Sequence, residues 1–83
     1  MPINQLLPMT GARPGDELRI HSVRADNHQT QRLRELGVLE GRRIKVITNN
    51  DPLICEIGES RFGVCRRLAR CILVESAPLA RSA

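Results

Sequence analysis

Aromatic side chains are almost absent from this chain. Its 83 residues include no Trp and no Tyr, and Phe62 is the one Phe. Grooves that recognise proline-rich peptides are lined by aromatic rings, and proteins that bind single-stranded nucleic acid stack bases on such rings. The composition therefore argues against polyproline recognition and against specific nucleic-acid recognition. It also predicts a modest core that is largely aliphatic.

Long hydrophobic runs are missing too. The first eight residues lack the basic start and apolar stretch of a signal peptide, and no segment approaches the length of a membrane span. We therefore expect a cytosolic protein without membrane insertion. The three cysteines, at positions 55, 65 and 71, fit that compartment, because their number is odd and their spacing is not that of a disulfide framework.

Motifs for catalysis are also lacking. The sequence contains no Gly-rich phosphate loop, no nucleophile elbow and no HExxH. Three cysteines and two histidines could supply a thiolate–imidazole pair, but any such set offers that pairing. We expect a protein that is not an enzyme.

Charge is present and is carried mainly by arginine. Twelve of the thirteen cationic side chains are Arg, and the formal net charge is +4. Arginine suits bidentate contact with carboxylate or phosphate, so an acidic partner is one interpretation and a solvated surface is the other. Glutamates interrupt the basic runs, so non-specific nucleic-acid binding at low salt is the most that this charge predicts.

The hydrophobic pattern changes period along the chain. Alternating segments predict strands at 17–23, 42–47 and 53–57, then one around Phe62 and Val64 and a last one around Ile72 and Val74. A short helix is expected at 29–36, with Asp26 or Asn27 as its cap. Five short strands with one inserted helix predict an all-β fold, a small bent barrel. It would form a single domain over 1–75, with a flexible tail at 76–83.

The segment from the helix into the next strand is the most informative part of the sequence. Leu33 and Leu36 are spaced for one helical face and are expected to pack. Gly37 supplies a left-handed residue that ends the helix, and Gly41 lies in a turn. Loops on a rigid barrel often carry binding function, so the arginines around this segment are the candidate contacts for a partner: Arg32, Arg34, Arg42 and Arg43.

Metal binding is a second possibility. Cys55 alternates with Leu53 and Ile57, so it is expected in the core. His21, Cys65 and Cys71 are expected to face outward, where they could form an open or intermolecular site for Fe(II) or Zn(II). The alternative is a surface histidine with two exposed thiols, since a closed zinc site wants cysteines two to four residues apart.

Taken together, these segments resemble the ferrous iron transport protein A (FeoA) family over about 6–74. The centre of the resemblance is the motif Arg32-Leu33-Arg34-Glu35-Leu36-Gly37, an arginine–leucine pair followed after two residues by leucine–glycine. Further matches are Pro14-Gly15, Glu40-Gly41, Asn50-Asp51-Pro52, and Ala69 with Ile72 and Val74. Cys65 departs from the family, which often carries arginine there. Some metal-dependent repressors have similar terminal domains, but this chain starts almost at its first strand, which indicates the stand-alone form.

The resemblance implies an SH3-like barrel and an accessory role in ferrous iron uptake. The expected partner is the cytosolic GTP-binding part of a FeoB-type transporter, which would place the chain in the cytoplasm, peripheral to the inner membrane. No cofactor is required by this reading, and a homo-oligomer is possible. Two alternatives stay open: a metal-responsive module that uses the surface His and Cys residues, and a small nucleic-acid-binding barrel.

Overall fold

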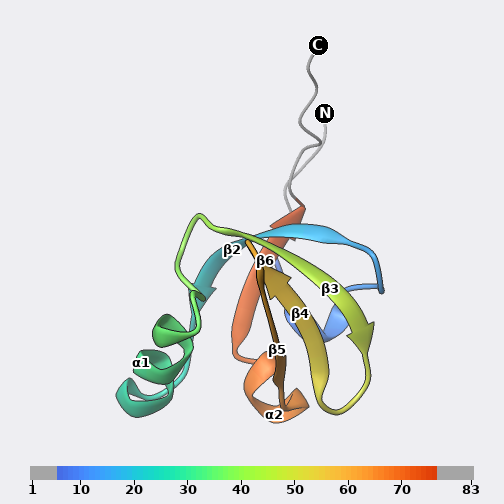
Figure 1. Cartoon of the computed structure of the whole chain (residues 1–83). Coiled ribbons are helices and arrows are strands. Elements are labelled where there is room, and N and C mark those ends of the chain that lie inside the picture. Colours follow the sequence, from blue (N-terminus) through green and yellow to red (C-terminus); the bar gives the residue numbers. More distant parts are fainter. Residues whose placement is uncertain (1–5, 77–83) are drawn as a thin grey trace.

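The computed structural model describes residues 6–76, which form one antiparallel sheet of six strands in the order β1-β6-β2-β3-β4-β5 (Figure 1). The strands are β1 (Leu7–Pro8), β2 (Glu17–Val23), β3 (Arg43–Asn49), β4 (Leu53–Ile57), β5 (Ser60–Val64) and β6 (Ile72–Ser76). The helices are the 3-10 turn η1 (Met9–Gly11), α1 (Asn27–Glu35) and α2 (Arg66–Ala69). The prediction of a mainly β fold with an inserted helix is confirmed.

Alternation along the strands places one face of the sheet in the core. In β2, Leu18 and Ile20 are buried while His21 is exposed, and in β4 every second residue from Leu53 to Ile57 is buried. Side chains of a strand point to opposite faces in turn, so this pattern fixes which face packs. The β2 and β4 bounds are those that the sequence predicted.

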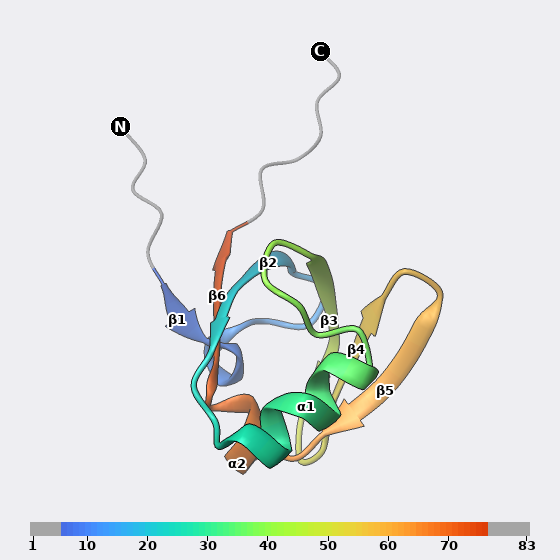
Figure 2. The ribbon, with the colours of Figure 1, turned by 90° about the vertical axis from the view of Figure 1, so that its left-hand side faces the viewer.

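The sheet bends around its core rather than lying flat (Figure 2). The register shifts between Ile20 and Ser22 in the β2–β6 pair, and between Val46 and Thr48 in the β3–β4 pair. Such bulges kink a strand and increase its twist. The fully buried side chains then meet in a single aliphatic cluster that reaches from Met9 to Val74.

Helix α1 begins and ends where the sequence contains capping residues. The Asp26 carboxylate accepts a hydrogen bond from the Gln29 backbone N–H at 2.8 Å. At the other end, the Val38 N–H donates to the Leu33 carbonyl and the Gly37 N–H to the Arg34 carbonyl, each at 2.9 Å. Gly37 has a φ of 100°, so this is the Schellman pattern that favours glycine.

The structure also differs from the predicted barrel. Strand β3 covers Arg43–Asn49 where 42–47 was predicted, and α1 covers Asn27–Glu35 where 29–36 was predicted. The structure has six strands, because Leu7–Pro8 pairs with β6, whereas the sequence led us to expect five. It also has a second short α-helix, α2, whereas the sequence predicted a single inserted helix. Ser76, which we expected in the tail, pairs with Leu18 as the last residue of β6, and 77–83 lies outside the described residues.

Asparagine 49 connects the first segment of the described chain to the end of β3. Its side-chain amide donates hydrogen bonds to the Thr10 carbonyl at 2.9 Å and to the Ala12 carbonyl at 2.6 Å. The guanidinium of Arg66 donates to the Asn49 side-chain oxygen. One half-buried side chain thus joins η1, β3 and the start of α2.

Candidate docking surface

The arginines predicted to contact a partner do not share one patch. Arg32 and Arg34 are exposed on α1, where helical spacing turns them to different sides. Arg34 borders a hollow that is also lined by Leu39 and Glu40, so it adjoins the turn after the helix. Arg32 lines a separate groove on the other side of α1.

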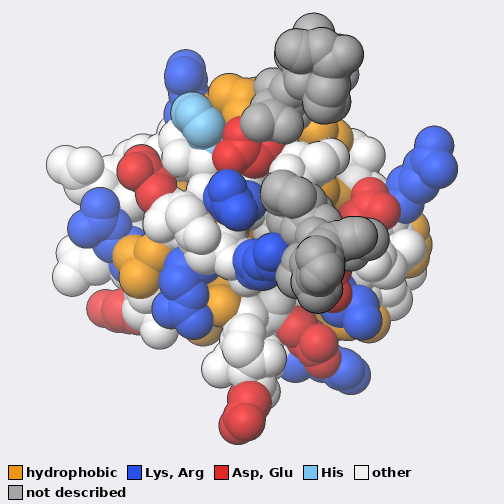
Figure 3. Space-filling view, turned by 90° about the horizontal axis from the view of Figure 1, so that it is seen from above, with side chains coloured by type: hydrophobic (Ala, Val, Ile, Leu, Met, Phe, Trp, Pro, Cys, Tyr) orange, Lys and Arg blue, Asp and Glu red, His pale blue; other side chains and the backbone are white. Residues whose placement is uncertain are grey.

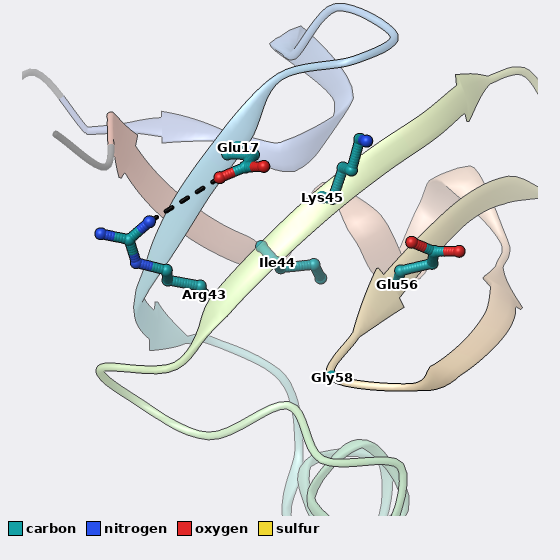
Figure 4. Close-up of a pocket in the computed structure, with 6 residues that line it drawn as sticks. All are labelled: Glu17, Arg43, Ile44, Lys45, Glu56 and Gly58. Carbon is teal, nitrogen blue, oxygen red and sulfur yellow. Dashed lines mark ion pairs between the residues drawn. The ribbon is translucent and has the colours of Figure 1, made fainter. Parts of the chain in front are cut away.

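Arg43 lies on the outer face of the sheet, in a hollow with charges of both signs (Figure 4). Its guanidinium is 3.7 Å from the Glu17 carboxylate, with both side chains about half exposed. Lys45 and Glu56 line the same hollow. Because carboxylates already accompany this arginine, the site is less suited to an acidic partner than α1 is.

Opposite charges are mixed elsewhere on the surface as well. The face in Figure 3 shows blue and red side chains interspersed, with no continuous basic stripe. A nucleic-acid site usually gathers its cations on one face or along one groove. The view therefore gives no support to a nucleic-acid interface on this face.

An apolar groove of about 290 Å³ lies between α1, the end of β5 and α2. In Figure 2, α1 runs across the end of the barrel with β5 to one side of it. Five of its lining side chains are aliphatic or thiol groups, and Arg32 is the charged one. The lining residues are Gln29, Arg32, Leu33, Leu36, Gly63, Val64, Cys65 and Leu68.

The prediction that both Leu33 and Leu36 pack is wrong for Leu36. Leu33 is 1% exposed and belongs to the core, but Leu36 is 43% exposed at the end of α1. Leu39, in the turn that follows, is 39% exposed. Two large apolar side chains thus lie open to solvent three residues apart, although they border different hollows.

The glycines of this motif have the predicted structural roles. Gly37 ends α1, and Gly41 has a φ of 88° in the turn before β3. The Gly41 N–H also donates to the Ile20 carbonyl at 2.8 Å, which holds the turn against β2. A side chain at either position would be strained by this backbone conformation.

The cysteines and histidine proposed as metal ligands do not form a cluster. Within residues 6–76, no group of three or more His, Cys, Asp and Glu side chains could hold a metal ion. Cys65 is exposed at the start of α2, and Cys71 is half-buried with its thiol directed at the Arg67 carbonyl, 3.8 Å away. A site shared between His21, Cys65, Cys71 and another molecule stays a prediction.

Cys55 lies in the core, as its alternation with Leu53 and Ile57 predicted. Burial raises the pKa of its thiol from 9.0 to about 12, because the surroundings disfavour the thiolate. A thiol with this pKa stays protonated at neutral pH, as suits a small buried core residue.

Sequence reasoning missed the groove, because its wall comes from segments far apart in the chain. Gly63 and Leu68 show no local pattern that indicates a binding site, and Cys65 was interpreted as a candidate metal ligand and as a position where the family often has arginine. The glycine inside β5 is not a signal of the groove either, because a side chain at Gly63 would meet Ile54 and Pro52 at 3.3 Å. Among the described residues, no helix is both long enough and apolar enough to cross a membrane.

Comparison with known proteins gives consistent matches. Residues 7–76 match the FeoA domain. A Methanocaldococcus jannaschii protein, provisionally named Fe(2+) transport protein A, is 34% identical over 73 residues, which cover 87% of this chain and 89% of the relative. The solution structure of FeoA from Chlorobium tepidum superposes with a TM-score of 0.81 at 23% identity, over 92% of this chain and 75% of that one.

A third similar protein has a fold that is described as an SH3 domain. The crystal structure of Stenotrophomonas maltophilia FeoA in complex with zinc, described as an SH3 domain protein, has a TM-score of 0.71 at 21% identity. The match covers 88% of this chain and 89% of that chain. At this identity the likeness concerns the fold, which is SH3-like in both.

Proposed function

This chain belongs to the FeoA family of ferrous iron transport accessory proteins, which are not enzymes, and on that premise we propose that it docks on the cytosolic GTP-binding part of a FeoB-type transporter. Docking there would assemble or regulate the transporter. The family places the chain in ferrous iron uptake, and the surface around α1 supports a role through protein contact.

The observation that carries this proposal is the combination of free arginines and exposed leucines around α1. Within residues 6–76, Arg32 and Arg34 form no ion pair, unlike Arg43 and Arg61. Leu36 and Leu39 lie exposed in the same part of the chain. Arginines able to pair with carboxylates, beside open apolar side chains, are the composition that protein interfaces favour.

Calorimetric titration of the full chain into the cytosolic part of the transporter, with and without guanine nucleotide, tests this proposal. We expect saturable binding, weakened about tenfold in the double variant Arg32→Ala with Arg34→Ala, since each lost charge contact costs up to about 1 kcal/mol. The circular dichroism spectrum and melting temperature should stay unchanged, because both side chains are exposed.

A matched control removes the same charge elsewhere. Arg13→Ala with Lys45→Ala also lowers the net charge by two, at exposed positions outside α1. Equal weakening by both double variants would mean that overall charge, and not this surface, determines the affinity. Absence of binding in every nucleotide state would overturn the proposal itself.

A further inference from the structure

Strand β5 is an edge of the sheet and pairs with β4 alone. The two strands are joined by Gly58 and Glu59, and Gly58 has a φ of 60°, as the first residue of a type II′ hairpin turn does. In such a hairpin Ser60 and Ile57 exchange backbone hydrogen bonds, and every second pair does so after them. The backbone N–H and C=O groups of Arg61 and Gly63 are therefore directed away from β4.

These outward groups are not taken up by another element. Within residues 6–76, no backbone hydrogen bond joins Arg61 or Gly63 to a helix, a loop or a strand other than β4. A strand with such a free edge is a template for one more strand. Gly63 is exposed at this edge, and its lack of a side chain is explained by Ile54 and Pro52, which a Cβ there would press against.

The free edge borders the apolar groove between α1 and α2. Gly63 and Val64 of β5 line the groove together with Leu33 and Leu36 of α1. A strand added beside β5 would thus send alternate side chains toward this groove. The groove gives such a strand an apolar contact, and the edge gives it backbone hydrogen bonds.

Charge around the groove favours an acidic partner. Arg32 is the one charged residue in the lining, and no carboxylate faces it there. Helix α2, which closes the groove through Leu68, contributes no acidic residue, and the guanidinium of its Arg66 is bound to Asn49. A carboxylate on the incoming segment would pair with Arg32.

We propose that the groove between α1 and β5 binds an extended peptide segment of a partner protein, which adds to the free edge of β5. The segment has an apolar side chain that enters the groove and a carboxylate that meets Arg32. Backbone pairing supplies affinity, and the groove and Arg32 supply specificity. This site shares Arg32 with the surface proposed above, but it is defined without reference to the transporter.

The test selects peptides on the protein itself. Displayed random peptides of roughly ten residues, long enough to form one strand, are enriched on the immobilised full chain. We expect enriched sequences that alternate apolar with other residues and carry Asp or Glu. Amide hydrogen exchange by NMR should then show protection of the Arg61 and Gly63 N–H groups when an enriched peptide is added. The Phe62 N–H, which already faces β4, should change little.

A pair of variants at one position isolates the backbone contribution. Arg61→Ala removes the ion pair with Glu56 but keeps the outward N–H, whereas Arg61→Pro removes both. Proline is tolerated on an edge strand where the N–H faces solvent. We expect Arg61→Pro to bind the enriched peptide roughly five- to tenfold more weakly than Arg61→Ala, as for one lost hydrogen bond. The hydrogen-exchange experiment uses the unaltered chain, so it tests peptide binding at the β5 edge even if the proline variant does not fold.

Several outcomes would overturn the proposal. They are the absence of any enriched peptide, enriched peptides with helical spacing that leave both amides unprotected, and concentration-dependent protection of both amides without peptide. The last would assign the edge to a second copy of this chain. Since no transporter is used, the proposed docking partner can fail while this site stands, and the reverse also holds.

Discussion

At the scale of single residues, Cys55 couples the small core to pH. Its thiol is fully buried and donates a weak hydrogen bond to the Phe62 carbonyl, 3.8 Å away. Burial raises its pKa to about 12, whereas exposure on unfolding returns it toward 9.0. The folded state therefore holds the proton more tightly than the unfolded state, and this part of the stability is complete below about pH 9.

We predict that the wild-type chain loses stability between pH 9 and about pH 12 relative to Cys55→Val. In this window the unfolded thiol ionises and the folded one does not, so the loss approaches about 1.4 kcal/mol per pH unit at most. Urea unfolding at a series of pH values measures it. Ionisations common to both proteins cancel in the difference, and parallel curves would refute the assignment.

Residues with strong local preferences were the ones that the sequence could predict. Gly37 and Gly41 have backbone conformations that other residues adopt only with strain, so their roles follow from their identity. The prediction that Leu36 packs was wrong, because its burial depends on what lies opposite the last turn of α1. The spacing from Leu33 does not contain that information. The groove residues Gly63 and Leu68 carried no comparable local signal.

At the scale of elements, α1 is held by one buried side chain and by its two capped ends. Leu33 is its one buried residue, so the packing of its nine residues is concentrated at a single position. Short helices are marginal in isolation, and a cap adds to the stability that packing supplies. Asp26 satisfies an N–H that would otherwise lack a partner at the start of the helix.

We predict that Asp26→Ala destabilises the protein by about 1 kcal/mol, as loss of an N-terminal cap does. Gln31→Ala, at an exposed position in the same helix, should change stability by less than about 0.5 kcal/mol. Chemical denaturation of both variants provides the comparison. An equal effect of the two substitutions would mean that the cap does not stabilise α1.

Long, regular elements were predicted well and short ones were not. The alternation in β2 and β4 extends over five or more residues, which was enough to fix their bounds. Strand β1 has two residues, one of them Pro8, and so shows no period at all. It forms because β6 offers an edge to pair with, a tertiary effect that lies outside any local pattern.

At the scale of the whole molecule, the net charge of +4 should influence association more than folding. Exposed charges around α1 attract a partner of opposite charge over distances that salt screens. The core that holds the fold together contains no charged residue among those described. Ionic strength should therefore separate the two properties.

We predict that the Kd for the transporter's cytosolic part rises roughly tenfold between about 0.05 and 0.5 M salt, mainly through a slower association rate. The melting temperature should change little over the same range. Surface plasmon resonance gives the rates, and calorimetric melting gives the stability. An association rate that is insensitive to salt would mean that the arginines do not accelerate association.

The overall fold was predictable because many weak patterns agreed along the chain. The distribution of the candidate arginines over separate parts of the surface was not predictable in this way. Arg32, Arg34 and Arg43 are close in sequence, yet the helical twist of α1 and the turn before β3 direct them to three different hollows. Which side chains share a surface depends on the path of the chain in space, which a run of residue types does not determine.

The pairing of β1 with β6 has a consequence for how this domain can be linked to others. Leu7 lies opposite Val74, so the described chain enters and leaves the sheet on neighbouring strands. Domains with adjacent ends tolerate insertion into a host protein and circular permutation. A short linker between these strands, with new termini opened at the Gly58–Glu59 hairpin, would preserve every strand of the sheet. Both connections of this domain to other parts of a longer chain would therefore leave from the β1–β6 side of the sheet.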